Sequence, residues 1–418
     1  MCIRDRYYTI IYNMFRTITT TARIQYKNNY TKINFKDTKN AYRLLNDNKL
    51  KEQQQIYKLF NMFSKNENIG QKAITTFMNT KPPLIYPVIQ NKLFDQFCGG
   101  EDLDSLTPLI KNIKNNNVTP MLNYGVEYST KEEDLDNCKD EMINMIKYLD
   151  KQKMNNLKGQ SIIRVTGVMS HDRLRKIQKG STFNSLEKDL WKKDLSRLEN
   201  ICEYAVAKKV KLLFDAETID IQTIIHNLSL QMMQRFNGNK PRIYGTIQFY
   251  RKDSHEQLNR LLKDGHDNKY IPGLKLVRGA YIHDETIAGR RHLLHDTKFE
   301  TDKSYNEGVT VCLNNIDSIA VCFAGHNTNT VKHIISGLIS NDIPANSPNI
   351  MLAQMQGMRN DITFNLSDVN VSQFIPYGKK NFLFPYLVRR GIENSSALGG
   401  SKEELRLITK EIKRRKIL

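Results

Sequence analysis

The sequence predicts a (β/α)₈ barrel preceded by a helical extension, and three observations lead to this fold class. Short apolar or β-branched runs recur eight times after residue 117, and each ends on a polar residue or a glycine. Helix-forming stretches such as 190–209 and 301–315 separate them, an alternation typical of a parallel sheet. Eight such units match a barrel of about 250 residues. A doubly wound open sheet is the competing fold, but it requires a glycine fingerprint after the first run, and none follows 118–125.

The N-terminal segment is rich in threonine and basic residues. From Met14 onward it carries Arg16 and Arg23, and no acidic residue occurs before Asp37. This composition is typical of a mitochondrial presequence and lacks the continuous apolar stretch of a secretory signal. We therefore predict a presequence over 1–35, although a disordered basic leader remains the alternative.

The next segment, 36–116, is predicted to be helical and irregular. Residues 42–63 have a helix-forming composition, whereas Pro82 and Pro83 interrupt the chain, and an asparagine-rich loop precedes the first strand. The barrel is predicted over 117–402 and a basic tail over 403–418. The eight predicted strands lie in the runs 118–125, 161–167, 210–217, 243–250, 274–281, 318–327, 349–357 and 371–378.

The chain is strongly basic, with 63 Lys and Arg against 44 Asp and Glu and a net charge of +19. Such an excess suits nucleic acid, an anionic membrane or an acidic substrate. A nucleic-acid-binding protein is not favoured, because the basic residues are spread through the chain without an interleaved aromatic stripe. The six cysteines show no metal-ligand spacing, so we expect reduced thiols and no metal site. No run approaches the roughly 18 apolar residues of a membrane span.

Polar residues stand where the predicted strands end. In a (β/α)₈ barrel the active site gathers at those ends, so we take them as candidate site residues, although ordinary loop solvation explains any single one. They are Asn123, Arg164, Asp215, Glu217, Gln248, Tyr250, Lys275, Arg278, His326, Asn327 and Gln354.

The last predicted helix, after residue 380, carries a distinctive stripe. Tyr386, Arg389, Arg390 and Glu393 stand at i, i+3, i+4 and i+7, which places them on one helical face. Two arginines can present forked donors to a carboxylate or a phosphate, and Glu393 is placed to brace them.

Seven motifs in this order resemble the proline dehydrogenase family: LLFDAET, IQFYRKDS, LKLVRGAYIHDE, FAGHN, QMQGM, FIPYG and PYLVRRGIENSS. The likeness covers about 118–400, and the upstream region is similar to that of mitochondrial, fungal-type members. It implies oxidation of L-proline to Δ1-pyrroline-5-carboxylate, with electrons passed through non-covalent FAD to membrane quinone. The expected location is the matrix side of the inner mitochondrial membrane.

The resemblance also implies roles for individual residues. Asp215 and Lys275 match the catalytic acidic and basic residues, with Lys275 near the flavin N5. The expected substrate-binding residues are Arg164, Tyr281, Tyr386, Arg389, Arg390 and Glu393, and the two adjacent arginines would hold the substrate carboxylate. The expected cofactor-binding residues are Ala216, Gln248, Arg278, Gly279, Ala280, Gly325, His326 and Asn327.

The chain departs from the family pattern at several positions. Arg164 replaces the usual Lys, Gly325 replaces a Ser or Thr, and Asn123 stands where Asp is common. Phe374 stands where many members have Tyr, which disfavours a substrate with an extra ring hydroxyl. A dehydrogenase of hydroxyproline or another cyclic imino acid remains the alternative, and the intact arginine stripe disfavours an inactive scaffold.

The tail over 403–418 is a candidate contact with the membrane. Leu405, Ile408 and Ile412 form a narrow apolar stripe beside a basic cluster, and basic residues bind an anionic membrane surface with about 1 kcal/mol each. We therefore expect peripheral association with the inner membrane, near ubiquinone. A frayed, solvated terminal helix is the alternative.

Overall fold

The computed structural model describes residues 33–63, 76, 80, 86–126, 131–154, 157–366, 369–395 and 400–417. Residues 1–32, and with them most of the predicted presequence, lie outside the described residues, as do Pro82 and Pro83.

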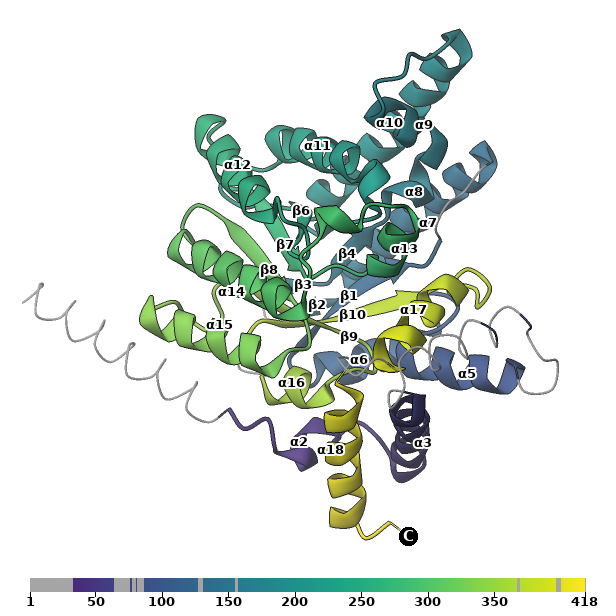
Figure 1. Ribbon diagram of the computed structural model, residues 1–418, viewed down its shortest axis with the longest axis vertical. Coiled ribbons are helices and arrows are strands. Elements are labelled where there is room, and N and C mark those ends of the chain that lie inside the picture. The colour runs from purple at the N-terminus through teal and green to yellow at the C-terminus, as the bar shows by residue number, and fades with distance from the viewer. Residues whose placement is uncertain are drawn as a thin grey trace, which may run out of the picture.

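Eight parallel strands form a closed barrel, so the predicted fold class is confirmed (Figure 1). The chain closes the barrel by pairing the first strand with the last, and Val118 lies opposite Val371. Each strand overlaps one of the eight runs expected from the sequence. The strands are β1 (Val118–Tyr124), β4 (Gln160–Ile163), β5 (Lys211–Phe214), β6 (Ile243–Gln248), β7 (Gly273–Val277), β8 (Ala320–Ala324), β9 (Ile350–Met355) and β10 (Val371–Tyr377). A separate two-stranded hairpin comprises β2 (Lys153–Met154) and β3 (Leu157–Lys158).

Helices follow the barrel strands and surround the sheet. Two of the long ones begin at reciprocal caps: the Asn184 side chain accepts the N–H of Glu187 while Glu187 accepts the N–H of Asn184, and Thr297 and Glu300 do the same. The helices within and around the barrel are α7 (Glu132–Lys151), α8 (Val165–Val168), α9 (His171–Gln178), α10 (Ser185–Ala207), α11 (Ile219–Phe236), α12 (Ser254–Asp267), α13 (Ile282–Ile287), the 3₁₀ helix η1 (Arg291–Leu293), α14 (Lys298–Asn314), α15 (Thr328–Ser340) and α16 (Asn360–Asn365).

The barrel has two apolar layers. Alternate strand residues face inward, and a small cluster fills the interior with Met121, Ile162, Leu213, Tyr244, Cys322 and Met351. The opposite faces of the strands pack against the surrounding helices and form the large core of the molecule. This double burial explains why the strands read as continuous apolar runs.

A second core joins the two ends of the described chain. The N-terminal helices are α2 (Thr38–Ala41), α3 (Asp47–Phe63), α5 (Tyr86–Phe97) and α6 (Thr107–Lys114), and the C-terminal helices are α17 (Phe384–Ser395) and α18 (Ser401–Arg414). In Figure 1, α18 lies between α2 and α3. Leu407 and Ile408 of α18 are fully buried together with Leu50, Tyr57 and Phe97.

The apolar stripe expected in the tail therefore belongs to this second core. Leu405 and Ile412 pack against it as well, so the alternative of a frayed, solvated helix is wrong. The basic residues Lys413 and Arg414 remain exposed. In the part of the chain that the structure describes, no helix combines the length and hydrophobicity needed to cross a bilayer.

Candidate active site

A buried charge cluster lies at the C-terminal end of the barrel. Asp215 follows β5, and its carboxylate accepts a hydrogen bond of 2.6 Å from Lys275 Nζ of β7. The Arg164 guanidinium, just after β4, lies 3.5 Å from the same carboxylate. The ends of β4, β5 and β7 thus bring together side chains that are up to 111 residues apart in the sequence.

The cluster holds Asp215 in its ionised form. Burial raises the pKa of Asp215, but Lys275, Arg164 and Arg389 outweigh this effect and keep the pKa below the ordinary value. The cost of burying this charge is therefore offset by its cationic neighbours.

Tyr281, one of the two tyrosines predicted to contact the substrate, connects this cluster to α17. Arg164 Nη1 donates a hydrogen bond of 3.2 Å to the Tyr281 hydroxyl. The Arg389 guanidinium lies over the Tyr281 ring, 5.8 Å from its centroid. Because Arg389 is on α17, this contact brings that helix to the barrel mouth.

The second arginine of the stripe is more deeply buried. Arg390 is 3% exposed, and its guanidinium lies 5.2 Å from the Tyr386 ring centroid and contacts Met355 Sδ at 2.8 Å. Tyr386 is tilted against Phe374, with 6.4 Å between the ring centroids. Glu393 lies on α17, but its side chain is outside the described part of the structure.

These contacts create a strongly positive cluster at the barrel mouth. Three cationic side chains, Lys275, Arg164 and Arg389, act on the Asp215 carboxylate, and Arg390 follows Arg389 on α17. Such an excess attracts a small anionic ligand, because the field between low-dielectric walls is only partly screened.

The residues predicted to bind the cofactor surround this pocket on several strand ends. Ala216 is buried beside Asp215, and Gln248 ends β6. Gln248 Nε2 donates to the Glu217 carbonyl at 3.1 Å, whereas its buried Oε1 finds no hydrogen-bond partner among the described residues. Asn123 Oδ1, at the end of β1, is in the same situation.

The Arg278-Gly279-Ala280 run directly follows β7. Arg278 donates to Asp302 Oδ1 at 2.6 Å and to Thr330 Oγ1 at 2.8 Å, and it stacks over the Tyr305 ring. Gly279 has φ +126°, and a Cβ there would lie 2.5 Å from the Tyr250 ring. Only glycine therefore fits this turn, whereas Ala280 is exposed.

The Gly325-His326-Asn327 loop follows β8. A Cβ at Gly325 would lie 3.1 Å from Arg278 Nη1, so a larger residue would displace that guanidinium. The Asn327 side chain caps α15 by accepting the N–H groups of Asn329 and Thr330. His326 Nε2 accepts the backbone N–H of Met355 at 3.0 Å. Burial, with Arg390 and other cations nearby, lowers the pKa of His326 to about 3, so the imidazole is neutral.

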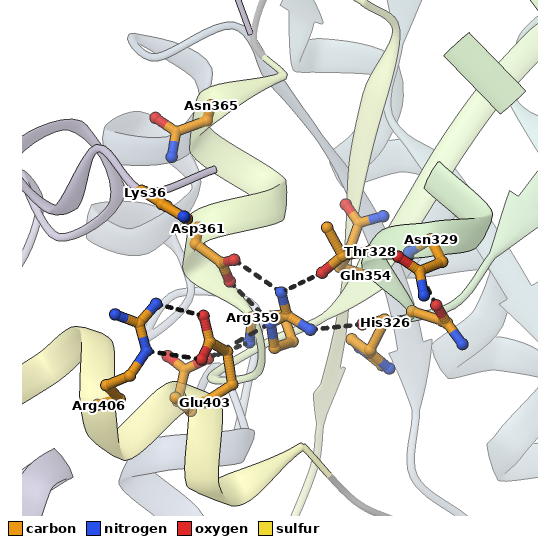
Figure 2. A network of polar contacts seen from close by, with 12 residues as sticks. Lys36, His326, Thr328, Asn329, Gln354, Arg359, Asp361, Asn365, Glu403 and Arg406 are labelled. Atoms are coloured by element: carbon orange, nitrogen blue, oxygen red, sulfur yellow. Dashed lines mark hydrogen bonds and ion pairs between the residues drawn. The ribbon is translucent and has the colours of Figure 1, made fainter. Parts of the chain in front are cut away.

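Arg359 was not predicted to be a site residue, yet its side chain holds the Gly325-His326-Asn327 loop in place (Figure 2). Its guanidinium donates to the His326 carbonyl at 2.8 Å and to Thr328 Oγ1 at 2.7 Å, and it forms a forked ion pair with Asp361. Its backbone N–H donates to Glu404 of α18. Arg359 has φ 53°, a left-handed backbone conformation that the neighbouring residues do not predict.

Comparison with known proteins agrees with the barrel and its motifs. A family model described as proline dehydrogenase matches residues 106–403. The chain is 27% identical over 384 residues to "Proline dehydrogenase 2, mitochondrial" of Arabidopsis thaliana, covering 79% of each chain. It is 26% identical over 372 residues to the hydroxyproline dehydrogenase of Xenopus laevis, covering 78% of each.

A solved structure shares the fold. The crystal structure of proline utilization A from Bdellovibrio bacteriovorus, inactivated by N-propargylglycine, superposes with a TM-score of 0.67 at 19% identity. The match covers 83% of the present chain but 37% of that protein, so the chain corresponds to about a third of it.

Proposed function

Since the chain belongs to the proline dehydrogenase family, we propose that it oxidises L-proline to Δ1-pyrroline-5-carboxylate, the first step of proline catabolism. The observation that carries the proposal is the positive charge at the barrel mouth, where Lys275, Arg164 and Arg389 act on the Asp215 carboxylate and Arg390 follows Arg389 on α17. A small amino-acid carboxylate suits that field.

In this proposal Arg389 and Arg390 bind the substrate carboxylate. Both lie on α17, and each is already ordered by an aromatic ring, Tyr281 for Arg389 and Tyr386 for Arg390. Planar guanidinium groups held in this way form paired hydrogen bonds to a carboxylate with little further loss of freedom. Glu393 braces the arginines, and Arg164 adds positive charge from the opposite wall.

Non-covalent FAD is the proposed cofactor, and the described residues fit it. The buried amide oxygen of Gln248 lacks a partner and can accept a hydrogen bond from a ring N–H. Ala216 and the Gly279-Ala280 turn allow close approach of the backbone, and Gly325, His326 and Asn327 complete the opposite side. Arg278 supplies positive charge for the pyrophosphate. When bound, FAD supplies the hydride acceptor.

The remaining site residues orient the substrate and provide charge. Tyr281 and Tyr386 form walls for the pyrrolidine ring and exclude water. Lys275 provides the cation that favours negative charge at the end of β7, and Asp215 holds the Lys275 ammonium in place through their 2.6 Å hydrogen bond.

Membrane quinone is the proposed electron acceptor, reached by peripheral binding to the matrix side of the inner mitochondrial membrane. The mitochondrial names of relatives such as the Arabidopsis protein, the basic leader and the net charge of +19 support this location. The apolar stripe of α18 is occupied by the second core. The tail can therefore contribute exposed charges such as Lys413 and Arg414, but it cannot insert that stripe without leaving α3.

Hydroxyproline is the second candidate substrate, because hydroxyproline dehydrogenases are among the relatives. Phe374 favours proline, since its ring lies beside Tyr386 and offers no hydroxyl to a hydroxylated substrate ring. A polar group that enters such a pocket without a partner is penalised.

The visible spectrum of the purified protein tests the proposal. We expect flavin absorption bands that bleach anaerobically on addition of L-proline, and much slower bleaching with trans-4-hydroxyproline. Bands that persist with proline but bleach with hydroxyproline would select the second candidate, and a protein without flavin bands after reconstitution with FAD would contradict both.

A further inference from the structure

A second polar hollow lies at the opposite, N-terminal end of the barrel. It has a volume of about 130 Å³ and is lined by residues at the start of five strands (β1, β4, β5, β9 and β10) and by preceding loop residues, including Arg242 before β6. Its location separates it from the active site by the full length of the barrel interior.

Strand register explains why these side chains converge. Met121, Ile162, Leu213 and Tyr244 fill the barrel interior. Because strand side chains alternate, the residues two positions earlier point into the same interior, one layer nearer the N-terminal ends. They are Thr119, Gln160, Lys211 and Arg242, and Ser372 lies opposite Thr119 on β10.

The hollow is positively charged without a counter-ion. Lys209, Lys211 and Arg242 line it, and no lining residue is acidic. Within the part of the chain that the structure describes, none of these three cations takes part in an ion pair. Many other basic residues on the described surface form ion pairs. Lys208, which precedes Lys209, pairs with Asp150.

Lys211 is the innermost of the three cations. Its ammonium donates to the Pro348 carbonyl at 3.1 Å and lies over the Tyr244 ring, 5.4 Å from the centroid. Burial, with Arg242 nearby, lowers the pKa of Lys211 to about 8. A partly buried cation without an ion pair is costly, and an anion in the hollow would reduce that cost.

Neutral groups complete the hollow. Gln160 is 3% exposed, and its Oε1 finds no hydrogen-bond partner among the described residues, while its Nε2 donates to Met351 Sδ. Thr119 and Ser372 add hydroxyl groups. Cations and hydroxyls bind the oxygens of an oxyanion, and the free Gln160 oxygen can accept the proton of a singly protonated one.

We propose that the N-terminal mouth of the barrel binds a tetrahedral oxyanion of the phosphate class through Lys211, Arg242 and the surrounding hydroxyls. The anion is either free phosphate or the phosphate of a lipid headgroup. This site is independent of the proposed oxidation of proline.

Calorimetric titration of the holoprotein with inorganic phosphate, in a chloride-free buffer at constant ionic strength, tests the site. We expect saturable one-to-one binding to the unaltered chain. Lys211→Met and Arg242→Gln should each weaken it about tenfold or more, because each removes a charge-assisted hydrogen bond. Lys240→Gln is the matched control, since it removes the same charge from an exposed position that does not line the hollow.

Sedimentation with phosphatidylcholine vesicles containing phosphatidic acid distinguishes the two sources. Binding that Lys211→Met abolishes and free phosphate competes away identifies a headgroup, whereas phosphate binding without vesicle binding identifies a free anion. Absence of saturable phosphate binding to the unaltered chain overturns the proposal, as does equal binding by all variants with native circular dichroism. If Lys211→Met does not fold, phosphate binding to Arg242→Gln and to the unaltered chain still tests the proposal.

Discussion

Asp215 is surrounded by more positive charge than its own ionisation requires. Lys275 bonds it directly, Arg164 lies 3.5 Å away, and Arg389 contributes through space. The positive field of these cations favours a further anion beside Asp215. If the substrate carboxylate provides that anion, the arginines should affect binding of substrate far more than binding of the cofactor.

We predict that Arg389→Lys and Arg390→Lys each raise KM for proline about tenfold or more while FAD stays bound. Lysine keeps the charge but loses the planar fork, so the paired hydrogen bonds are lost. Steady-state kinetics and the flavin-to-protein absorbance ratio check this.

Arg406→Lys is the control, because Arg406 forms a forked pair with Glu403 on the exposed face of α18. An unchanged KM in both active-site variants would remove the carboxylate-binding role from these arginines.

The pH dependence of turnover should follow the ionisation of the substrate ammonium. His326 has a pKa of about 3 and Asp215 has a depressed pKa, so neither changes charge between roughly pH 6 and 9. Proline must lose its ammonium proton before C5 can release hydride, and the rate should rise through mildly alkaline pH. Stopped-flow flavin reduction at saturating proline measures this step, and a flat profile would contradict it.

At the scale of elements, local sequence was sufficient to locate the barrel. Each strand is a short apolar run buried on both faces, and the polar residue after it marks the mouth, as Asp215 does after β5. The helical period also placed Tyr386, Arg389 and Arg390 on one face of α17. Both patterns depend on neighbours along the chain, which a sequence displays directly.

Contacts between distant elements could not be read in this way. Arg359 reaches the His326 loop because its backbone adopts a left-handed conformation, and no periodicity encodes that choice. The apolar stripe of α18 was visible, but its partner α3 lies more than 300 residues earlier. A stripe that packs on a helix and a stripe that lies on a membrane have the same sequence pattern.

We predict that Arg359→Lys weakens FAD retention several-fold without unfolding the protein. The compact lysine ammonium cannot reproduce the planar fork that bonds Asp361 while it reaches the His326 carbonyl and Thr328, so the loop after β8 loses support. Equilibrium dialysis of FAD and the flavin fluorescence spectrum measure the effect.

Arg175→Lys provides the comparison, because Arg175 pairs with Asp220 on α11, outside the Arg359 network. Equal FAD affinity in the two variants would mean that Arg359 supports the fold rather than the loop.

At the scale of the whole molecule, a carboxylate is buried where the two ends of the described chain meet. Glu404 of α18 is 1% exposed, and it accepts hydrogen bonds from the Tyr42 hydroxyl at 2.9 Å and from the Arg359 N–H at 3.1 Å. Burial and the Asp361 carboxylate raise the pKa of Glu404 to about 8. The folded protein therefore holds a proton here that the unfolded chain releases at lower pH.

This difference predicts a stability loss as pH rises. Between the ordinary glutamate pKa and pH 8 the folded state binds more protons, so the free energy of unfolding should fall, by up to about 5 kcal/mol. Glu404→Gln should flatten this part of the profile. Urea unfolding at several pH values measures it, with Glu403→Gln on the exposed face as control; parallel profiles in all three proteins would exclude Glu404 as the source.

The pairing of β1 with β10 governs the order in which the protein can acquire structure during synthesis. Val118 leaves the ribosome long before Val371, and Tyr42 long before Glu404. Until translation is nearly finished, the first strand has one edge without a partner and the N-terminal helices lack their apolar cover. The nascent chain must therefore remain open almost to its last helix, a state that calls for chaperone protection and suits a polypeptide that passes through a narrow translocation pore before it folds.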